Sequence, residues 1–103
     1  MPDIVRITVI HKAFYPEMAD KYLAKGRDAG ACPALAEGQT FLYEGNAKMP
    51  EGFCPWAWID IFHSCATLHA SGFDNQWYAR GNLRVQCCSD GVRPVSFLLE
   101  VIE

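Results

Sequence analysis

The sequence predicts an α+β fold: a single domain over residues 1–103, in which one long helix packs on a mostly antiparallel sheet. Three observations predict it. Apolar and polar residues alternate over residues 4–10, which is the period of a half-buried strand. A stripe of apolar residues at helical spacing follows Pro55. Two more apolar runs flank Asp90-Gly91, and this dipeptide is a strong hairpin signal.

The first half of the chain is predicted to hold two strands and one helix. Ile4–Ile10 is the first strand. A helix begins at Pro16, because a missing N–H costs nothing in a first turn, and it ends at Gly26. The loop that follows is rich in glycine, alanine and proline, and we expect one helical turn in it at 33–36. Gln39–Glu44 is the second strand.

The longest helix is predicted to begin at Pro55 and to end at Gly72. Its apolar stripe consists of Trp58, Ile61, Phe62, Cys65, Leu68 and His69. Polar residues occupy a different stripe of the same helix, so we expect one face to pack on the sheet.

The chain is predicted to close with two strands, Leu83–Cys88 and Arg93–Ile102, which gives the order β-α-β-α-β-β. A tight two-residue loop at Asp90-Gly91 would place Cys88 opposite Arg93. Pro94 cannot donate to a strand ladder, so a bulge or an edge position is expected there.

The composition excludes several classes of protein. The net charge is −3, whereas general nucleic-acid binders carry a basic patch, so no nucleic-acid partner is expected. No apolar run approaches the roughly 20 residues that span a bilayer, so no membrane role is expected. The first residues lack the pattern of a secretory signal, and we expect a cytoplasmic protein.

Cysteine is the unusual ingredient, with five residues: Cys32, Cys54, Cys65, Cys87 and Cys88. An odd number cannot pair completely, and a cytoplasmic protein keeps its thiols reduced. Cys87 and Cys88 are adjacent in a predicted strand, so their thiols should point to opposite faces of the sheet.

Cys54 is the first candidate catalytic residue. Pro55 is suited to be the first residue of the long helix, which makes Cys54 its N-cap. A thiol there faces unpaired N–H groups and the positive end of the helix dipole, and both favour the reactive thiolate. The alternative is a buried cysteine that only caps the helix.

Asp60 and His63 are the next candidates. They are three residues apart on one helix face, so Asp60 could orient the imidazole for general acid–base work, with Trp56 as a flat wall beside it. The alternative is a solvated helix face without chemistry.

Three further residues are expected to bind a substrate. Arg93 would hold an anionic group and would stabilise a thiolate at Cys88. Cys32 precedes Pro33 and could cap the short helical turn expected there. Asp90 is interpreted as a turn former.

Four segments together resemble a family of small, uncharacterised bacterial and fungal proteins of about this length. The segments are Cys32-Pro33, Glu37-Gly38-Gln39-x-Phe41, Pro50-x-Gly52-Phe53-Cys54-x-Trp56-Ala57-Trp58-x-Asp60-Ile61, and Cys88-x-Asp90-Gly91-x-Arg93-Pro94-Val95. The resemblance covers nearly the whole chain. It implies a shared fold and carries no activity or catalytic residue across.

The sequence leaves three hypotheses of function open. The first is a small enzyme or ligand pocket that needs no cofactor and acts on a small polar or electrophilic molecule, with lyase, isomerase and hydrolase chemistry all open. The second is a soft-metal site, for zinc or copper, built from Cys32, Cys54, Cys88 and His63. The third is a non-catalytic interaction module that forms a homo-oligomer, since a small core leaves apolar surface uncovered.

Overall fold

The computed structural model describes residues 4–71 and 77–102 of the chain. Its helices and strands follow the predicted order: β1 (Val5–Lys12), α1 (Pro16–Tyr22), β2 (Thr40–Tyr43), α2 (Pro55–His69), β3 (Leu83–Cys87) and β4 (Val95–Val101). A short 3-10 helix, η1 (Gly26–Ala29), follows α1. None of the helices in the described residues has the length and hydropathy to cross a bilayer.

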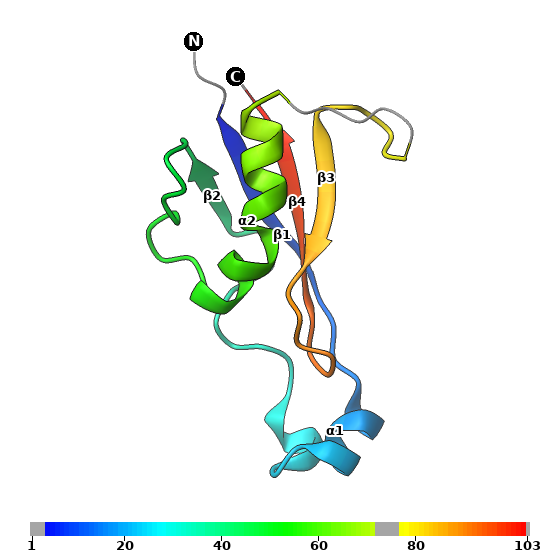
Figure 1. Ribbon diagram of the computed structural model, residues 1–103. Helices are drawn as coiled ribbons and strands as arrows, with labels where there is room; N and C mark the ends of the chain where they lie inside the picture. The colour runs from blue at the N-terminus through cyan, green and yellow to red at the C-terminus, as the bar shows by residue number, and fades with distance from the viewer. Residues whose placement is uncertain (1–3, 72–76, 103) are drawn as a thin grey trace.

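The four strands form one antiparallel sheet in the order β2-β1-β4-β3, which confirms the predicted fold class. The two central strands come from opposite ends of the chain (Figure 1). Ile7 of β1 is paired with Phe41 of β2 on one side and with Leu99 of β4 on the other. The sheet is therefore held together by pairing between residues far apart in sequence.

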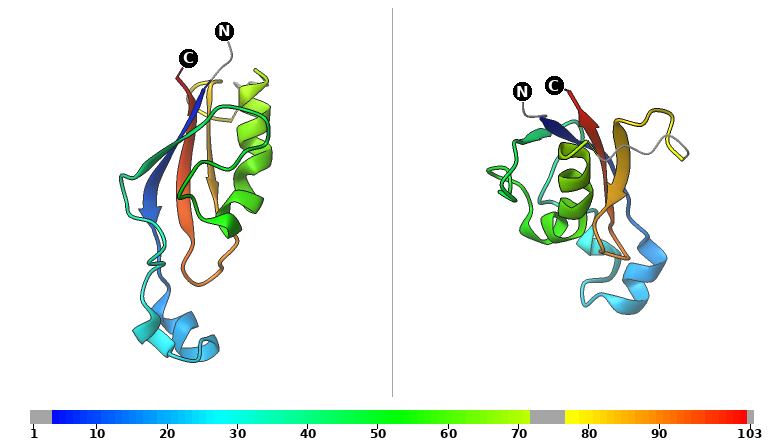
Figure 2. Two further views of the ribbon diagram at one scale, coloured as in Figure 1. Left: turned by 90° about the vertical axis from the view of Figure 1, so that its left-hand side faces the viewer. Right: turned by 45° about the horizontal axis from the view of Figure 1, so that its top comes forward.

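The core lies between α2 and one face of the sheet (Figure 2). Ile61, Cys65 and Leu68 of α2 are fully buried, as the helical spacing predicts. Ile7 and Phe97 are fully buried on the facing side of the sheet. Because each large apolar side chain that is fully buried contributes about 2 kcal/mol, these residues hold α2 against the strands.

The helices α1 and η1 lie beyond one end of the sheet, opposite the two termini (Figure 1). The chain is accordingly elongated, with extents of 48 × 30 × 20 Å. Two hydrogen bonds join the start of this extension to the loop between β3 and β4. The backbone N–H of Ala13 donates to the carbonyl of Pro94, and that of Tyr15 donates to the carbonyl of Val92, both at 2.9 Å.

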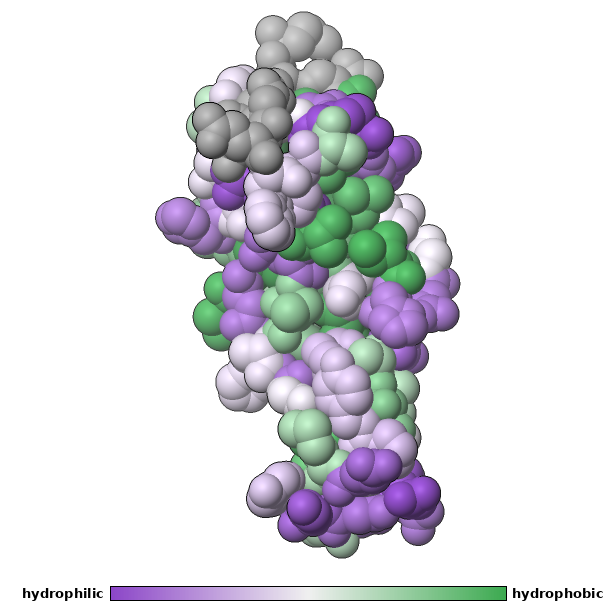
Figure 3. Space-filling view, turned by 90° about the vertical axis from the view of Figure 1, so that its right-hand side faces the viewer, coloured by the Kyte–Doolittle hydropathy of each residue, from purple (hydrophilic) through white to green (hydrophobic). Residues whose placement is uncertain are grey.

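The side of the molecule that carries β3 has an apolar band. Figure 3 shows hydrophobic side chains gathered across the middle of this side, with hydrophilic ones at the end that carries α1. Ile59 of α2 and Val85 of β3 are exposed large hydrophobic residues, at 72% and 40%.

The predicted helix ends were wrong. α1 ends at Tyr22 rather than Gly26, because Leu23 already has extended backbone angles (φ −99°, ψ 143°). Residues 33–35 form bends, and no helical turn is present over 33–36, so Cys32 caps no helix there. α2 ends at His69, where the N–H of Ala70 closes the last turn, and the predicted end at Gly72 lies outside the described residues.

The predicted hairpin is present, but its loop and its strand ends were wrong. The strands are Leu83–Cys87 and Val95–Val101, so the loop spans residues 88–94. The N–H of Cys88 donates to the carbonyl of Val95 at 3.1 Å, so Cys88 lies opposite Val95 and not opposite Arg93. Pro94 lies in the loop, and the bulge is instead in β1, between Val9 and His11.

Candidate functional site

Cys32, Cys54 and Cys88 line one cleft of about 490 Å³. They come from three separate segments: the loop after η1, the residue before α2, and the residue after β3. A cleft of this volume has the size of a small-molecule site. The structure therefore brings together the three cysteines that the sequence analysis selected one by one.

Cys54 is the N-cap of α2, and Pro55 is the first helical residue, as predicted. Its backbone is extended (φ −74°, ψ 121°), which turns the chain into the helix. The sulfur makes no capping hydrogen bond, so the expected contact with the first N–H groups of the helix is not formed. The half-buried thiol lines the cleft with its sulfur uncommitted to the helix end.

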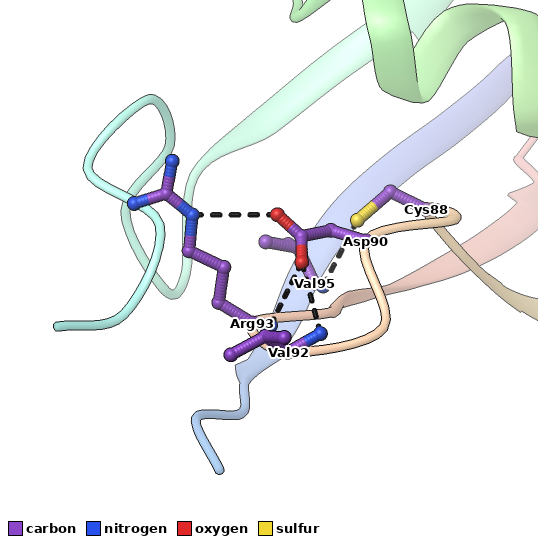
Figure 4. Close-up of polar contacts among 5 residues, drawn as sticks. All are labelled: Cys88, Asp90, Val92, Arg93 and Val95. Atoms are coloured by element: carbon purple, nitrogen blue, oxygen red, sulfur yellow. Dashed lines mark hydrogen bonds and ion pairs between the residues drawn. The ribbon is translucent and has the colours of Figure 1, made fainter. Parts of the chain in front are cut away.

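The thiol of Cys88 accepts a hydrogen bond at the cleft. The backbone N–H of Val95 donates to its Sγ at 3.3 Å (Figure 4). Its neighbour Cys87 is exposed and paired with Ser96, whereas Cys88 packs against the hydrophobic core. The two adjacent thiols thus lie in different surroundings, as the alternation along a strand predicts.

Asp90 shapes the loop that carries Arg93 (Figure 4). Its Oδ1 accepts hydrogen bonds from the N–H groups of Val92 and Arg93, at 2.9 and 3.0 Å, and its Oδ2 accepts one from Nε of Arg93 at 3.3 Å. Burial alone would raise the pKa of the Asp90 carboxyl, but the two amides and the guanidinium outweigh burial and lower it. Asp90 is the expected turn former and also orients Arg93.

Arg93 lines the cleft from this loop. Its Nε is used by Asp90, and the side chain is 33% exposed. Within residues 4–71 and 77–102, no hydrogen bond or ion pair involves its two terminal nitrogens. These nitrogens can therefore receive an anionic group from a ligand.

Asp60 lies in the cleft wall, but its partner is not the predicted one. Its Oδ2 accepts a hydrogen bond from the backbone N–H of Ser89 at 2.8 Å, which ties α2 to the loop after β3. Sequence reasoning missed Ser89, because a backbone amide 29 residues away leaves no local signal.

His63 is exposed and does not line the cleft. It lies about one turn further along α2 than Asp60, which is the last residue of this helix that lines the cleft. The expected pairing of His63 with Asp60 corresponds to no hydrogen bond or ion pair among the described residues.

The two tryptophans of α2 have different surroundings. Trp56 is 78% exposed and lines the cleft. Trp58 packs into the core beside Tyr43 and Phe53, with ring centres 5.5 and 6.1 Å away. Trp56 is therefore free to cover a ligand, and Trp58 fixes the start of α2.

Cys65 is fully buried and does not line the cleft. Burial raises the pKa of the Cys65 thiol to about 12, so this cysteine is a core residue.

Across the part of the chain that the structure describes, no group of three His, Cys, Asp or Glu side chains is placed to hold a metal ion.

Comparison with family models, with curated proteins and with solved structures finds no match to this chain.

Proposed function

We propose that the cleft binds a small polar electrophile and that Cys54 attacks it. The observation that carries this proposal is the convergence of Cys32, Cys54 and Cys88 with Arg93 on one cavity. In the step we propose, the Cys54 thiolate forms a bond to the electrophilic atom of the ligand. The departing group, or the oxygen that receives the displaced electron pair, takes up the proton that the thiol released.

Cys54 is a better nucleophile for this step than Cys88. Cys54 lies at the N-terminus of a helix of 15 residues, and its sulfur makes no capping bond, so its lone pairs are free to attack a ligand. The sulfur of Cys88 already accepts a hydrogen bond from Val95, which holds it in place. Cys88 and Cys32 then serve as walls of the binding site.

The other side chains of the cleft bind the ligand or hold part of the site in position. Arg93 holds an anionic group of the ligand through its terminal nitrogens, and Trp56 covers the mouth of the cleft. Asp60 is a positioning residue, because it fixes the loop that carries Cys88 and Arg93. His63 takes no part in this scheme, since it does not line the cleft.

Selective alkylation tests the proposal. Untagged, reduced protein is treated with one equivalent of iodoacetamide, and the modified cysteine is identified by mass spectrometry. We expect Cys54 to react first, ahead of the exposed Cys87. The Cys54→Ser variant should lose the fast reaction, and the matched Cys87→Ser variant should keep it. Reaction at Cys87 ahead of Cys54 in the unmodified sequence would contradict the proposal.

The same sample tests the soft-metal alternative. A native mass spectrum of protein purified without chelator reports bound metal. Stoichiometric metal that protects Cys32, Cys54 and Cys88 from alkylation would favour zinc or copper binding over the proposed nucleophile. Metal-free protein with a reactive Cys54 would favour the nucleophile.

A second candidate function is self-association, and the apolar band on the β3 side favours it. Ile59 of α2 and Val85 of β3 are exposed large hydrophobic residues, and apolar surface is often covered by a subunit partner. Sedimentation velocity is the test. A dimer that Ile59→Lys converts to a monomer supports this candidate, and a monomer at high concentration rejects it.

A further inference from the structure

A second hollow, of about 470 Å³, adjoins the cysteine cleft. Pro33, Asp90 and Arg93 line both cavities, so the Asp90–Arg93 pair lies where the two meet. The far wall of the second hollow comes from the segment around η1, including Lys25 and Asp28. A ligand that is longer than the cysteine cleft therefore has a place for its other end.

The charges in the second hollow have opposite signs and are available to a ligand. No hydrogen bond or ion pair between described residues involves the side chain of Lys25 or Asp28, whereas the nearby Arg27 is paired with Asp20 at 2.6 Å. One cation and one anion at neighbouring positions match an amino-acid group, which carries a carboxylate and an ammonium on the same carbon. Arg93, at the junction, matches a second carboxylate.

We propose that the ligand is a peptidic or amino-acid disulfide, with its sulfur in the cysteine cleft and its zwitterionic end between Lys25 and Asp28. This inference rests on the proposed function of Cys54. Among electrophiles, a disulfide suits the site because charge develops on sulfur, and no donor for an oxyanion is required. Cys32 and Cys88 line the same cleft as Cys54, and their polarizable sulfur suits a ligand that carries sulfur.

The step balances without a further reactant. The Cys54 thiolate attacks one sulfur of the ligand, a bond forms between the two sulfurs, and the disulfide bond of the ligand breaks. The departing thiolate takes up the proton that Cys54 released. The ligand is the oxidant, and the protein thiol is oxidised to a mixed disulfide.

The experiment compares two disulfide probes on reduced protein. Oxidised glutathione carries an amino-acid zwitterion on each half, and hydroxyethyl disulfide carries no charge. The rate of mixed-disulfide formation is measured at Cys54 and at Cys87 by peptide mass spectrometry, so that Cys87 corrects for the intrinsic reactivity of each probe. We expect the corrected rate at Cys54 to be about tenfold higher with oxidised glutathione, as a charge-assisted contact of ordinary strength would give.

Two variants test whether Lys25 and Asp28 cause the preference for oxidised glutathione. Lys25→Ala and Asp28→Ala should each remove most of the preference for oxidised glutathione over hydroxyethyl disulfide. Lys48→Ala, at an exposed position that lines neither cavity, is the matched control and should keep the preference.

The outcomes separate this inference from the proposed function. Equal corrected rates with the two probes, or a preference that survives both variants, would overturn the peptidic ligand while Cys54 remained the fast nucleophile. A Cys54 that reacts no faster than Cys87 with either probe would overturn both proposals.

Discussion

The carboxylate of Asp60 accepts a hydrogen bond from the backbone N–H of Ser89 at 2.8 Å, and this contact joins the two halves of the cysteine cleft. Asp60 lies in the second turn of α2, the helix that begins after Cys54. Ser89 directly follows Cys88 and begins the loop that carries Arg93. The contact therefore fixes the thiol at the helix end relative to the thiol and the guanidinium of the loop.

Removing this contact should loosen the loop. We expect Asp60→Ala to lower the free energy of unfolding by about 2 kcal/mol, since hydrogen bonds to charged groups contribute about 1.5–3 kcal/mol. Asp60→Asn keeps an acceptor oxygen and should lose about half as much. Urea unfolding measures the stability, and amide hydrogen exchange at Ser89 measures the contact itself.

Glu51→Ala, at an exposed position before α2, is the control and should leave the exchange of Ser89 unchanged. An unaltered exchange rate of Ser89 in Asp60→Ala would show that the contact is not formed in solution.

The stability that Asp90 contributes to the fold should be lost in acid. Its pKa is lowered from the ordinary value of 3.8 in the folded chain, because the amides of Arg93 and Val92 and the Arg93 guanidinium outweigh the effect of burial. A carboxyl with a lowered folded-state pKa stabilises the fold above its unfolded-state pKa. This contribution is lost as the pH falls through the folded-state pKa.

The Asp90→Asn variant should therefore be less stable than the natural sequence near neutral pH, and the difference should shrink as the pH falls below the ordinary carboxyl pKa of 3.8. Urea midpoints measured across this range provide the test. A difference that is the same at neutral and acid pH would contradict the assigned ionisation.

Cys65 should be the least reactive thiol in the folded chain. Burial raises its pKa to about 12 from 9.0, so the unfolded chain releases this proton at a lower pH than the folded one. The stability that comes from keeping the thiol neutral is complete below pH 9.0 and is lost as the pH rises toward 12.

We expect iodoacetamide to modify Cys65 only after the protein is unfolded in urea. Mass spectrometry of the native and unfolded samples measures this, and the exposed Cys87 is the internal control. Labelling of Cys65 at the rate of Cys87 under native conditions would be incompatible with its burial.

Local sequence patterns were sufficient for most of the fold. The alternation around Val5, Ile7 and Val9 predicted a strand with one buried face, and all three residues are buried there. Pro55 predicted the start of α2 and the N-cap position of Cys54. The strand order could not be predicted, because pairing of β1 with β4 depends on contacts across almost the whole chain.

The candidate site was predictable residue by residue but not as an arrangement. The sequence selected Cys32, Cys54 and Cys88 from their local positions, yet only the packing of α2 on the sheet brings them to one cleft. The loop with Arg93 was misjudged, because Asp-Gly usually forms a two-residue turn. Here the carboxylate of Asp90 holds two amides beyond Gly91 and opens a wider loop.

Gly45, in the connection from β2 to α2, lies close to the end of that helix. Its backbone has φ +111°, and a Cβ added there would lie 3.0 Å from the imidazole of His69, at the end of α2. The same imidazole packs on the ring of Tyr43, with ring centres 5.4 Å apart. Gly45→Ala should therefore cost about 2–3 kcal/mol of stability, through backbone strain and displacement of His69 together.

Two comparisons separate these causes. Gly52 also has a positive φ, +81°, but no atom lies within 4 Å of an added Cβ, so Gly52→Ala should cost only about 1 kcal/mol. In a His69→Ala background the cost of Gly45→Ala should fall to that of Gly52→Ala, because the obstructing ring is gone. Urea unfolding of the four Gly45 and His69 combinations measures the coupling. Additive costs at Gly45 and His69 would show that the imidazole does not lie over Gly45.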